Sequence, residues 1–372
     1  MSTVPNSFIR PKIQAMPAYE PILPFEVLSR QLGRLPEQII KLDANENPYG
    51  ISQAVRRALA EMEFPHIYPD PESRALRGAL FQFTGVPAEN LLAGSGADEL
   101  IDLVTRLLLE PGDRVINCPP TFGMYPFDTE LNAGSIVNVP RRPDFSLDLD
   151  AIRATVEQTQ PKILFLASPN NPDGSLIPAD VLDKLLSLPV LVVLDEAYIE
   201  FADEKDTLGK SISNITHVAE RENLIVLRTF SKWAGLAGLR VGYGGFPAWL
   251  MPTLWKAKQP YNVNVAASTA AIASLEDAKT IAEMVARLRA ERQRLMDGLK
   301  RIPYLQTYPT CANFILCRVG GREAAHLKAD LAEKYGILVR YFNKPGLHDC
   351  IRISVGKPEY TNALLEALQC LS

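Results

Sequence analysis

The chain of 372 residues is 47% hydrophobic and 22% charged, and its formal net charge is −4. These values are ordinary for a globular protein, and the slight negative charge favours neither a nucleic-acid partner nor an anionic membrane surface. No apolar run reaches the roughly 20 residues that cross a bilayer, and the first residues lack the apolar core of a secretory signal.

Five cysteines and four histidines are scattered along the sequence, and no two cysteines form a Cys-x-x-Cys pair. This pattern predicts no metal site and is typical of a reducing compartment. We therefore expect a cytoplasmic protein that holds no metal.

Residues 1–40 are rich in proline, which predicts an arm lying on another surface rather than a folded unit. A helical pattern follows over residues 52–62, and residues 65–71 form an extended loop that carries Tyr68. Helical and extended patterns then alternate, with helices expected at 99–109 and 124–132 and strands at 114–117 and 136–139.

Three later segments are almost continuously apolar: 162–167, 190–194 and 224–227. Such strands, when they alternate with helices, predict a mostly parallel sheet that helices cover on both faces. The expected fold class is therefore α/β, and ligands of such sheets bind beyond the carboxyl ends of the strands.

The last third of the chain predicts a smaller α+β unit. A long helical stretch is expected at 268–300, then strands at 313–318 and 350–355 with a helix at 322–335. We expect an N-terminal arm (1–45) that joins the small domain, a large domain (46–261) and a small C-terminal domain (262–372).

The first candidate motif is Ala93-Gly-Ser-Gly-Ala-Asp-Glu-Leu100, in which glycines precede a helix. Free backbone N–H groups at a helix N-terminus bind anions, with Ser95, Ala97 and Asp98 as candidates here. Alternatively, Ser95 or Asp98 only caps the helix. The spacing matches neither the Gly-x-Gly-x-x-Gly of a dinucleotide site nor a P-loop.

Two further motifs lie at strand ends. In Ser168-Pro-Asn-Asn-Pro-Asp-Gly174, the Asn171 amide could point at a ring substituent, although the same residues also favour a simple turn. Asp195 ends a very apolar strand, where an unpaired buried charge costs several kcal/mol. A protonated pyridine nitrogen would pair with it, and Tyr198 could donate to a ring hydroxyl; otherwise Asp195 caps the next helix.

The most informative run is Arg228-Thr-Phe-Ser-Lys-Trp-Ala-Gly-Leu-Ala-Gly-Leu-Arg240, after the strand at 224–227. Lys232 offers an amine for imine chemistry, and Ser231 and Arg240 could hold a phosphate. An amine beside a phosphate cradle is what pyridoxal phosphate (PLP) requires. A solvated surface lysine is the more frequent case, but the order of these motifs at successive strand ends favours PLP.

Together these segments resemble the fold-type I PLP-dependent aminotransferases, most closely the histidinol-phosphate aminotransferase subgroup. The resemblance runs from Tyr19 to about Gly356. Its motifs are Lys41-Leu-Asp-Ala-Asn-Glu-Asn-Pro-Tyr-Gly50, Tyr68-Pro-Asp-Pro71, Ser168-Pro-Asn-Asn-Pro172, Asp195-Glu-Ala-Tyr-Ile-Glu-Phe201, Ser231-Lys232 with Arg240, and Arg352-Ile-Ser-Val-Gly356.

The resemblance implies that Lys232 binds the cofactor covalently and acts in catalysis. It also implies that Asp195 pairs with the ring nitrogen, while Asn171 and Tyr198 bond the ring oxygen. The cofactor phosphate would be held by groups from two segments: Ala97 and Asp98, and Ser231 and Arg240.

Tyr68 would reach the cofactor of a neighbouring subunit, which implies a homodimer with shared active sites. Arg352 would bind the substrate anion, and its neighbours in the substrate site would be Tyr19, Asn47, Tyr261 and Arg340. From the residues alone, Arg352 could equally form a surface salt bridge, and the tyrosines could be packing aromatics.

Three positions depart from the family pattern. Phe122 stands where a tyrosine stacks on the cofactor ring; it can still stack, and Tyr125 could compensate for the lost hydroxyl. Asp173 replaces a common threonine, and Ile67 replaces a residue that is frequently basic.

The activity implied is transfer of the amino group of L-histidinol phosphate to 2-oxoglutarate, a step of histidine biosynthesis. An aromatic or other amino-acid aminotransferase is the nearest alternative, and a PLP-dependent decarboxylase of a phosphorylated amino acid is another. A PLP-binding regulator is disfavoured, because the short N-terminal arm is not basic and does not fit a helix-turn-helix. A nicotinamide dehydrogenase is disfavoured because the glycine fingerprint is absent.

Overall fold

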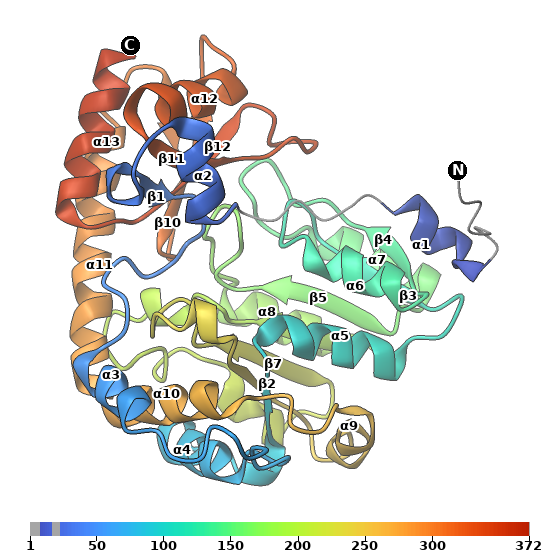
Figure 1. Ribbon diagram of the computed structural model, residues 1–372. Helices are drawn as coiled ribbons and strands as arrows, with labels where there is room; N and C mark the ends of the chain where they lie inside the picture. The colour runs from blue at the N-terminus through green and yellow to red at the C-terminus, as the bar shows by residue number, and fades with distance from the viewer. Residues whose placement is uncertain (1–7, 17–22, 372) are drawn as a thin grey trace.

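The computed structural model describes residues 8–16 and 23–371. Two sheets are surrounded by helices (Figure 1). The larger sheet has seven strands in the order β2-β8-β7-β6-β5-β3-β4. Their bounds are β2 (Leu91–Gly94), β3 (Arg114–Asn117), β4 (Ser135–Asn138), β5 (Ile163–Ala167), β6 (Leu191–Asp195), β7 (Leu224–Thr229) and β8 (Gly242–Gly245).

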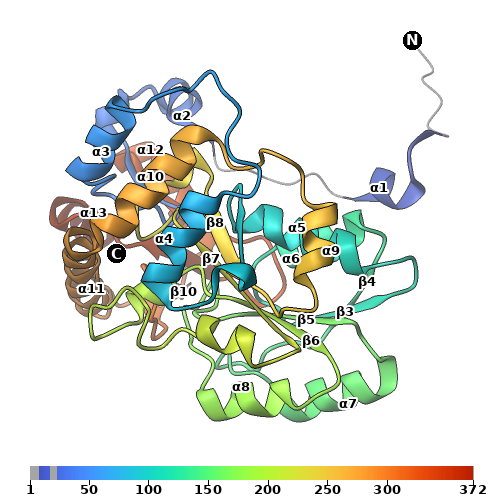
Figure 2. The ribbon, with the colours of Figure 1, turned by 90° about the horizontal axis from the view of Figure 1, so that it is seen from below.

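The large sheet is mostly parallel, because only β8 runs antiparallel to its neighbours β7 and β2. Successive residues of a central strand face opposite sides: Leu164 packs into one apolar core and Phe165 into the other. Figure 2 shows α7 and α8 on one side of β5 and β6, with α5, α6 and α9 on the other. The predicted α/β class, with helices on both faces, is confirmed.

The helices that accompany the large sheet are α3 (Gln53–Ala60), α4 (Arg74–Thr84), α5 (Ala97–Leu108), α6 (Met124–Leu131), α7 (Leu149–Thr159), α8 (Ala179–Leu186), α9 (Met251–Ala257) and α10 (Val265–Glu276), with the short 3-10 helices η3 (Ala88–Asn90), η4 (Ile199–Phe201), η5 (Ile215–Ala219) and η6 (Ala237–Leu239). The helices predicted at 52–62, 99–109 and 124–132 correspond to α3, α5 and α6. Local sequence fixes some of their ends; the Ser52 side chain, for example, accepts a hydrogen bond from the Val55 N–H at the start of α3.

The smaller sheet has five strands in the order β1-β11-β12-β10-β9. Its strands are β1 (Ile40–Leu42), β9 (Leu305–Thr307), β10 (Phe314–Val319), β11 (Ile337–Tyr341) and β12 (Cys350–Ser354), and its helices are α12 (Ala324–Tyr335) and α13 (Pro358–Cys370). β1 pairs with β11 in parallel, with Ile40 opposite Ile337. The N-terminal segment therefore contributes a strand to the sheet of the C-terminal third.

The expected arm, residues 1–40, contains short helices where the structure describes it, and its role as an arm on another surface stays a prediction. Helices α1 (Pro11–Ala15) and α2 (Phe25–Leu32) and the 3-10 helix η2 (Pro36–Gln38) lie there. The reason is packing: α2 turns Leu28 into a small apolar cluster with Ile39 and Leu338, so its short amphipathic pattern suffices.

The helical stretch predicted at 268–300 is two helices, α10 and α11 (Ala278–Leu299), separated at Asp277. The core of the large sheet takes up residues of α10 and of α11 as far as Leu288, whereas Leu295 and Leu299 belong to the core of the smaller sheet. α11 thus runs beside both units (Figure 1). The domain division stays a prediction, and this packing favours a boundary within α11 rather than at residue 261.

Within residues 8–16 and 23–371, no helix combines the length and the apolar character needed to span a membrane. The same residues contain no cluster of three or more histidine, cysteine or acidic side chains suited to a metal ion.

Candidate active site

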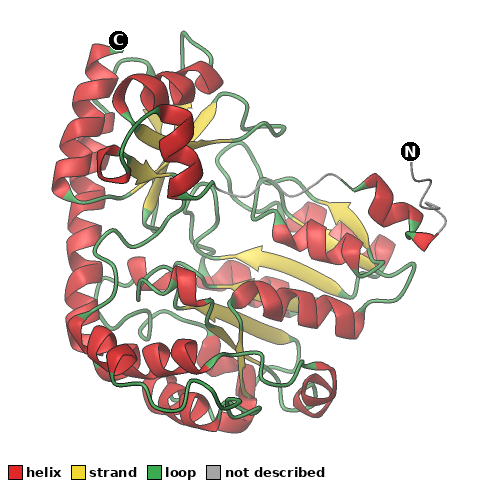
Figure 3. Cartoon of the chain, in the orientation of Figure 1, coloured by secondary structure: helices red, strands yellow, loops and turns green. Residues whose placement is uncertain are grey.

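A pocket lies at the carboxyl ends of β5, β6 and β7. The strands of the large sheet end on the side where the smaller sheet lies (Figure 3). The wall of the pocket holds the predicted cofactor residues other than Tyr68: Ala97, Asp98, Phe122, Asn171, Asp195, Tyr198, Ser231, Lys232 and Arg240. They meet because the carboxyl ends of adjacent parallel strands lie at one edge of a sheet. Asp195 is the last residue of β6, and Lys232 follows the end of β7 at Thr229.

Asp195 is a buried carboxylate with two hydrogen-bond donors. Its Oδ2 accepts from the Tyr125 hydroxyl at 2.7 Å, and its Oδ1 accepts from the Ala197 N–H at 3.0 Å. Burial raises the pKa of Asp195 to about 6, while these hydrogen bonds act to lower it. No ion pair in the described part of the chain joins Asp195 to a basic side chain. A buried carboxylate that stays ionised at neutral pH is suited to a cationic ligand.

The sequence suggests Tyr125 only as a substitute for the hydroxyl that is lost at Phe122. In the structure, the Tyr125 hydroxyl is a hydrogen-bond partner of Asp195. Its ring is fully buried, stacked on Phe165 at a centroid distance of 4.9 Å and edge-on to Phe122 at 5.6 Å. Burial and the Asp195 carboxylate raise its pKa well above the usual value, so its hydroxyl remains a donor to Asp195.

A second part of the pocket combines a helix N-terminus with a guanidinium and a hydroxyl. Gly96 precedes α5 with φ of +85°, and a Cβ there would lie 2.6 Å from Arg240 Nη2. Arg240 Nη1 lies 3.4 Å from Ser231 Oγ, and Nη2 lies 3.1 Å from Asp98 Oδ2. The glycine therefore leaves room for Arg240 beside the backbone N–H groups of Ala97 and Asp98, an arrangement that suits an anion such as phosphate.

The Lys232 amine and the Tyr198 ring lie together on the wall of the pocket. Lys232 Nζ is 6.0 Å from the centroid of the Tyr198 ring and donates a hydrogen bond to the Ala44 carbonyl at 3.2 Å. Among the described residues no carboxylate forms an ion pair with Lys232. The Tyr198 hydroxyl oxygen accepts a hydrogen bond from Asn45 Nδ2 at 3.0 Å. Asn45 was not among the predicted site residues.

The smaller sheet reaches this pocket through Arg352. Arg352 Nη1 donates to Asn171 Oδ1 at 2.6 Å, and Nη2 donates to the Asp43 carbonyl at 2.8 Å. Arg340 stands directly opposite Arg352 in the β11–β12 pairing. Both guanidinium groups lie beside the ring of Phe342, at 5.9 Å for Arg340 and 5.6 Å for Arg352.

Besides Arg340 and Arg352, three of the predicted site residues that the structure describes do not line the pocket: Tyr68, Tyr261 and Asn47. Tyr68 and Tyr261 are exposed and stack on each other at 4.7 Å. Asn47 uses its amide within the protein: Nδ2 donates to the Trp233 carbonyl, and Oδ1 accepts from the Tyr49 N–H. Tyr19 lies outside the described residues. The roles of these residues stay predictions.

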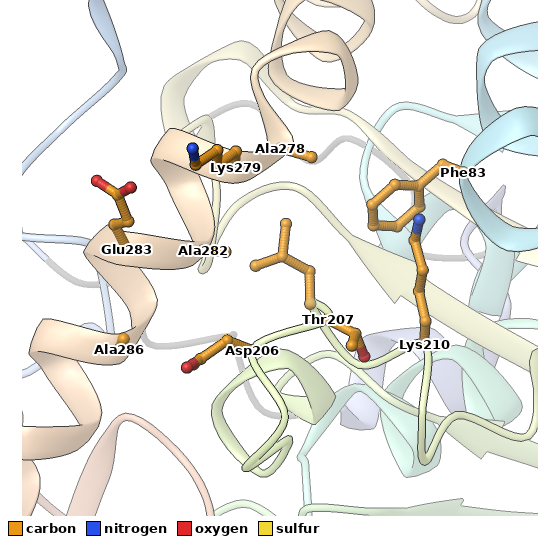
Figure 4. Close-up of a pocket in the computed structure, with 10 residues that line it drawn as sticks. Phe83, Asp206, Thr207, Lys210, Ala278, Lys279, Ala282, Glu283 and Ala286 are labelled. Carbon is orange, nitrogen blue, oxygen red and sulfur yellow. The ribbon is translucent and has the colours of Figure 1, made fainter.

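A separate hollow lies between the C-terminal end of α4, the loop at residues 206–210 and the start of α11 (Figure 4). Lys210 lies beside the ring of Phe83, with Nζ 4.3 Å from the ring centroid. None of the predicted site residues lines this hollow, so the chemistry is expected in the pocket around Lys232.

Comparison with known proteins agrees with this geometry. The model of the family "Aminotransferase class I and II" matches residues 37–368. Histidinol-phosphate aminotransferase 1, chloroplastic, from Arabidopsis thaliana is 55% identical over 99% of this chain and 86% of its own length. Histidinol-phosphate aminotransferase from Roseiflexus castenholzii is 50% identical over 98% of both chains.

A solved structure leads to the same family. The crystal structure of histidinol-phosphate aminotransferase from Sinorhizobium meliloti in complex with pyridoxal-5'-phosphate has 30% sequence identity, covers 100% of both chains and gives a TM-score of 0.88. The chain therefore belongs to the class I and II aminotransferases and, within them, to the histidinol-phosphate aminotransferase family.

Proposed function

We propose that this protein is a PLP-dependent aminotransferase that converts L-histidinol phosphate and 2-oxoglutarate to imidazole acetol phosphate and L-glutamate in histidine biosynthesis. The observation that carries the proposal is the single pocket in which a lysine, a buried carboxylate and an anion cradle meet. The names of the relatives from Arabidopsis thaliana and Roseiflexus castenholzii support the choice of substrate.

The residues present fit PLP. The cradle of Gly96, Ser231 and Arg240 suits its phosphate, and the buried Asp195 carboxylate suits a protonated ring nitrogen. Phe122 supplies an aromatic face on the same wall. When bound, PLP acts as a sink for the electrons that remain on the substrate carbon after its proton has left.

Each side chain then has a definite task. Lys232 would bind the cofactor aldehyde through Nζ and, once displaced by the amino donor, would move the proton of the substrate Cα. Asp195 would hold the proton on the ring nitrogen, and the Tyr125 hydroxyl would keep its carboxylate oriented. Because Asn171 Oδ1 accepts from Arg352, its amide N–H groups remain to donate to the ring oxygen together with Tyr198.

The arginine pair would select anionic substrates. Arg340 and Arg352 lie opposite each other on adjacent strands. Like charges at directly opposite positions of a sheet repel each other, and an anion bound between the two guanidinium groups would relieve this repulsion. A phosphate monoester carries about −1.5 to −2 charges at neutral pH, more than a single carboxylate. The pair therefore favours a phosphorylated donor while still accepting a dicarboxylate.

We also propose a homodimer with shared sites. The stacked rings of Tyr68 and Tyr261 are 80% and 44% exposed, and such a pair is suited to burial against a second copy. The cytoplasm stays our proposal for location, although several relatives are named as chloroplastic.

A donor screen tests the substrate. The purified holoenzyme is mixed with histidinol phosphate, tyrosine, phenylalanine or glutamate, and conversion of the cofactor to its amino form is followed by absorbance. We expect histidinol phosphate to react with a higher second-order rate constant than tyrosine or phenylalanine. A faster reaction with tyrosine would make the protein an aromatic aminotransferase, and release of CO₂ would make it a decarboxylase.

A further inference from the structure

The linker of residues 43–47 between β1 and α3 touches the pocket from the side of the smaller sheet. Its carbonyls accept hydrogen bonds from two predicted site residues: that of Asp43 from Arg352 and that of Ala44 from Lys232. Asn45, the next residue of the linker, donates a hydrogen bond to the Tyr198 hydroxyl oxygen. The linker therefore contacts three predicted site residues within a few positions.

Asn45 is buried and hydrogen-bonded to two residues of the smaller unit, Ser354 and Asn313. It is 1% exposed and has a left-handed backbone, with φ of 56°. Its N–H donates to Ser354 Oγ at 2.8 Å, and its carbonyl accepts from Asn313 Nδ2 at 2.9 Å. Ser354 Oγ in turn donates to Asn45 Oδ1 at 2.9 Å.

These contacts form one consistent hydrogen-bond network that orients the Asn45 amide. Ser354 Oγ already accepts from the Asn45 N–H, and its one proton goes to Asn45 Oδ1. The other end of the amide, Nδ2, is consequently turned to the Tyr198 hydroxyl oxygen at 3.0 Å. Because Asn45 is the donor in this bond, the Tyr198 hydroxyl keeps its own proton for a different acceptor.

We propose that Asn45 is a positioning residue: by donating to the Tyr198 oxygen, it directs the Tyr198 hydroxyl proton into the pocket, toward the ring oxygen of the cofactor. The proposal rests on the proposed function and deepens it, since it assigns control of the Tyr198 donor to a residue that the smaller sheet holds. It also explains why a buried asparagine occupies a left-handed position in the linker, a conformation that asparagine tolerates better than most residues do.

The consequence can be measured without turnover. A donor to the ring oxygen stabilises its anionic form and so makes the link between Lys232 and the cofactor lose its proton at lower pH. The absorbance of the holoenzyme changes with that proton. If Asn45 aims the Tyr198 hydroxyl, removing the Asn45 amide should raise the pH midpoint of the absorbance change by about half a unit to one unit.

The test uses two variants of Asn45 in two backgrounds. Asn45→Gly keeps access to the left-handed backbone and removes the amide, and Asn45→Asp keeps the shape but replaces the donor with an acceptor. Each is made in the natural chain and with Tyr198→Phe. Asn90→Ala is the matched control. Like Asn45, Asn90 is a buried asparagine whose Nδ2 donates a hydrogen bond, but its acceptor is the Phe246 carbonyl and it does not line the pocket.

We expect both Asn45 variants to raise the midpoint in the natural chain, and Asn45→Gly, which adds no charge, to cause no further shift once Tyr198 is phenylalanine. Asn90→Ala should lower the melting temperature and leave the midpoint unchanged. An unchanged midpoint in both Asn45 variants, with a shifted midpoint in Tyr198→Phe, would overturn the proposal and leave the function intact. Equal shifts of Asn45→Gly in both backgrounds would also overturn it. A natural chain that takes up no PLP would instead remove the proposed function itself.

Discussion

The large sheet supplies the pocket with side chains from the ends of β6 and β7, whereas the smaller sheet reaches it with Arg352 on β12 and with the linker 43–47. Asp195 ends β6 and Lys232 follows β7, two strands whose residues are almost all buried. Arg352 donates a hydrogen bond to Asn171 and Asn45 donates one to Tyr198, and both acceptors line the pocket. The proposed catalytic groups thus come from the large sheet, and the proposed groups for the substrate anion come from the smaller one.

From this contrast we expect substitutions in the two units to affect different kinetic constants. Changes on the large-sheet side should lower kcat, because they remove groups that act on the reacting atoms. Changes on the smaller-sheet side should raise KM for the anionic substrates, because they remove binding that ground state and transition state share. The predictions below test that division.

Lys232→Ala should have the largest effect. Without the amine there is neither a covalent link to the cofactor nor a group to move the substrate proton, so turnover should fall by at least about 10,000-fold. Glutamate-forming activity and a borohydride-stable label on the tryptic fragment that contains position 232 are the measurements. Lys256→Ala is the control, because Lys256 is an exposed lysine on α9 outside the pocket. Normal turnover in Lys232→Ala would refute the assignment.

Asp195→Asn should lower kcat by on the order of 100- to 1,000-fold, since an amide cannot hold the ring nitrogen in its protonated state as a carboxylate does. KM for both substrates should change little. Steady-state kinetics with histidinol phosphate and 2-oxoglutarate test this. A rise in KM with unchanged kcat would place Asp195 in substrate binding and break the division between the two sides.

Arg352→Gln should raise KM for histidinol phosphate by roughly 10- to 100-fold, the equivalent of losing a charged hydrogen bond, with a smaller change in kcat. Arg340→Gln should act in the same direction and more weakly, because only Arg352 is tied to Asn171 in the pocket wall. Arg318→Gln is the control: Arg318 lies on the same sheet and pairs with Asp349 instead. Loss of kcat alone in Arg352→Gln would contradict the prediction.

The large sheet was predictable from the sequence because its strands are short apolar runs with a local signal. The strand predicted at 114–117 is β3 itself. β8 was missed because Gly242-Tyr-Gly-Gly245 has almost no apolar residues. Gly242 lies where neighbouring backbone leaves no room, because a Cβ there would lie 2.7 Å from the Ala97 nitrogen. That requirement arises only after folding.

The site residues that the large sheet carries were predictable because they too follow apolar strands with a clear sequence signal. Asp195 and Lys232 follow strands, so their meeting could be inferred from the order of a parallel sheet. The part played by the linker 43–47 could not, because Asn45 and Asn47 are alike in sequence and only tertiary contacts separate them. Likewise, the Tyr125 hydroxyl meets Asp195 across a separation of 70 residues.

Tyr125→Phe should lower kcat by about tenfold, the value of one hydrogen bond to a charged group. The phenyl ring keeps the stacking on Phe165, so the variant should remain folded. Because the Tyr125 hydrogen bond helps to keep the Asp195 carboxyl ionised, its loss should also move the acid limb of the pH–kcat profile to higher pH. An unchanged profile would mean that the hydroxyl only fills space.

The smallest effect on activity is expected for Asp128→Asn, which should instead change stability. Burial, followed by the nearby Asp102 and Asp98, raises the pKa of Asp128 to about 7, and its Oδ2 has no hydrogen-bond partner in the described residues. A carboxyl whose folded pKa exceeds its unfolded pKa of about 4 destabilises the fold above that value, and the cost grows until pH passes the folded pKa. Asn removes the cost, so the free energy of unfolding should rise by on the order of 2 kcal/mol at pH 8 and by little near pH 4. Urea unfolding at the two pH values measures this, and kcat should stay unchanged because Asp128 does not line the pocket. An equal gain at both pH values would show that the charge of Asp128 is not the cause.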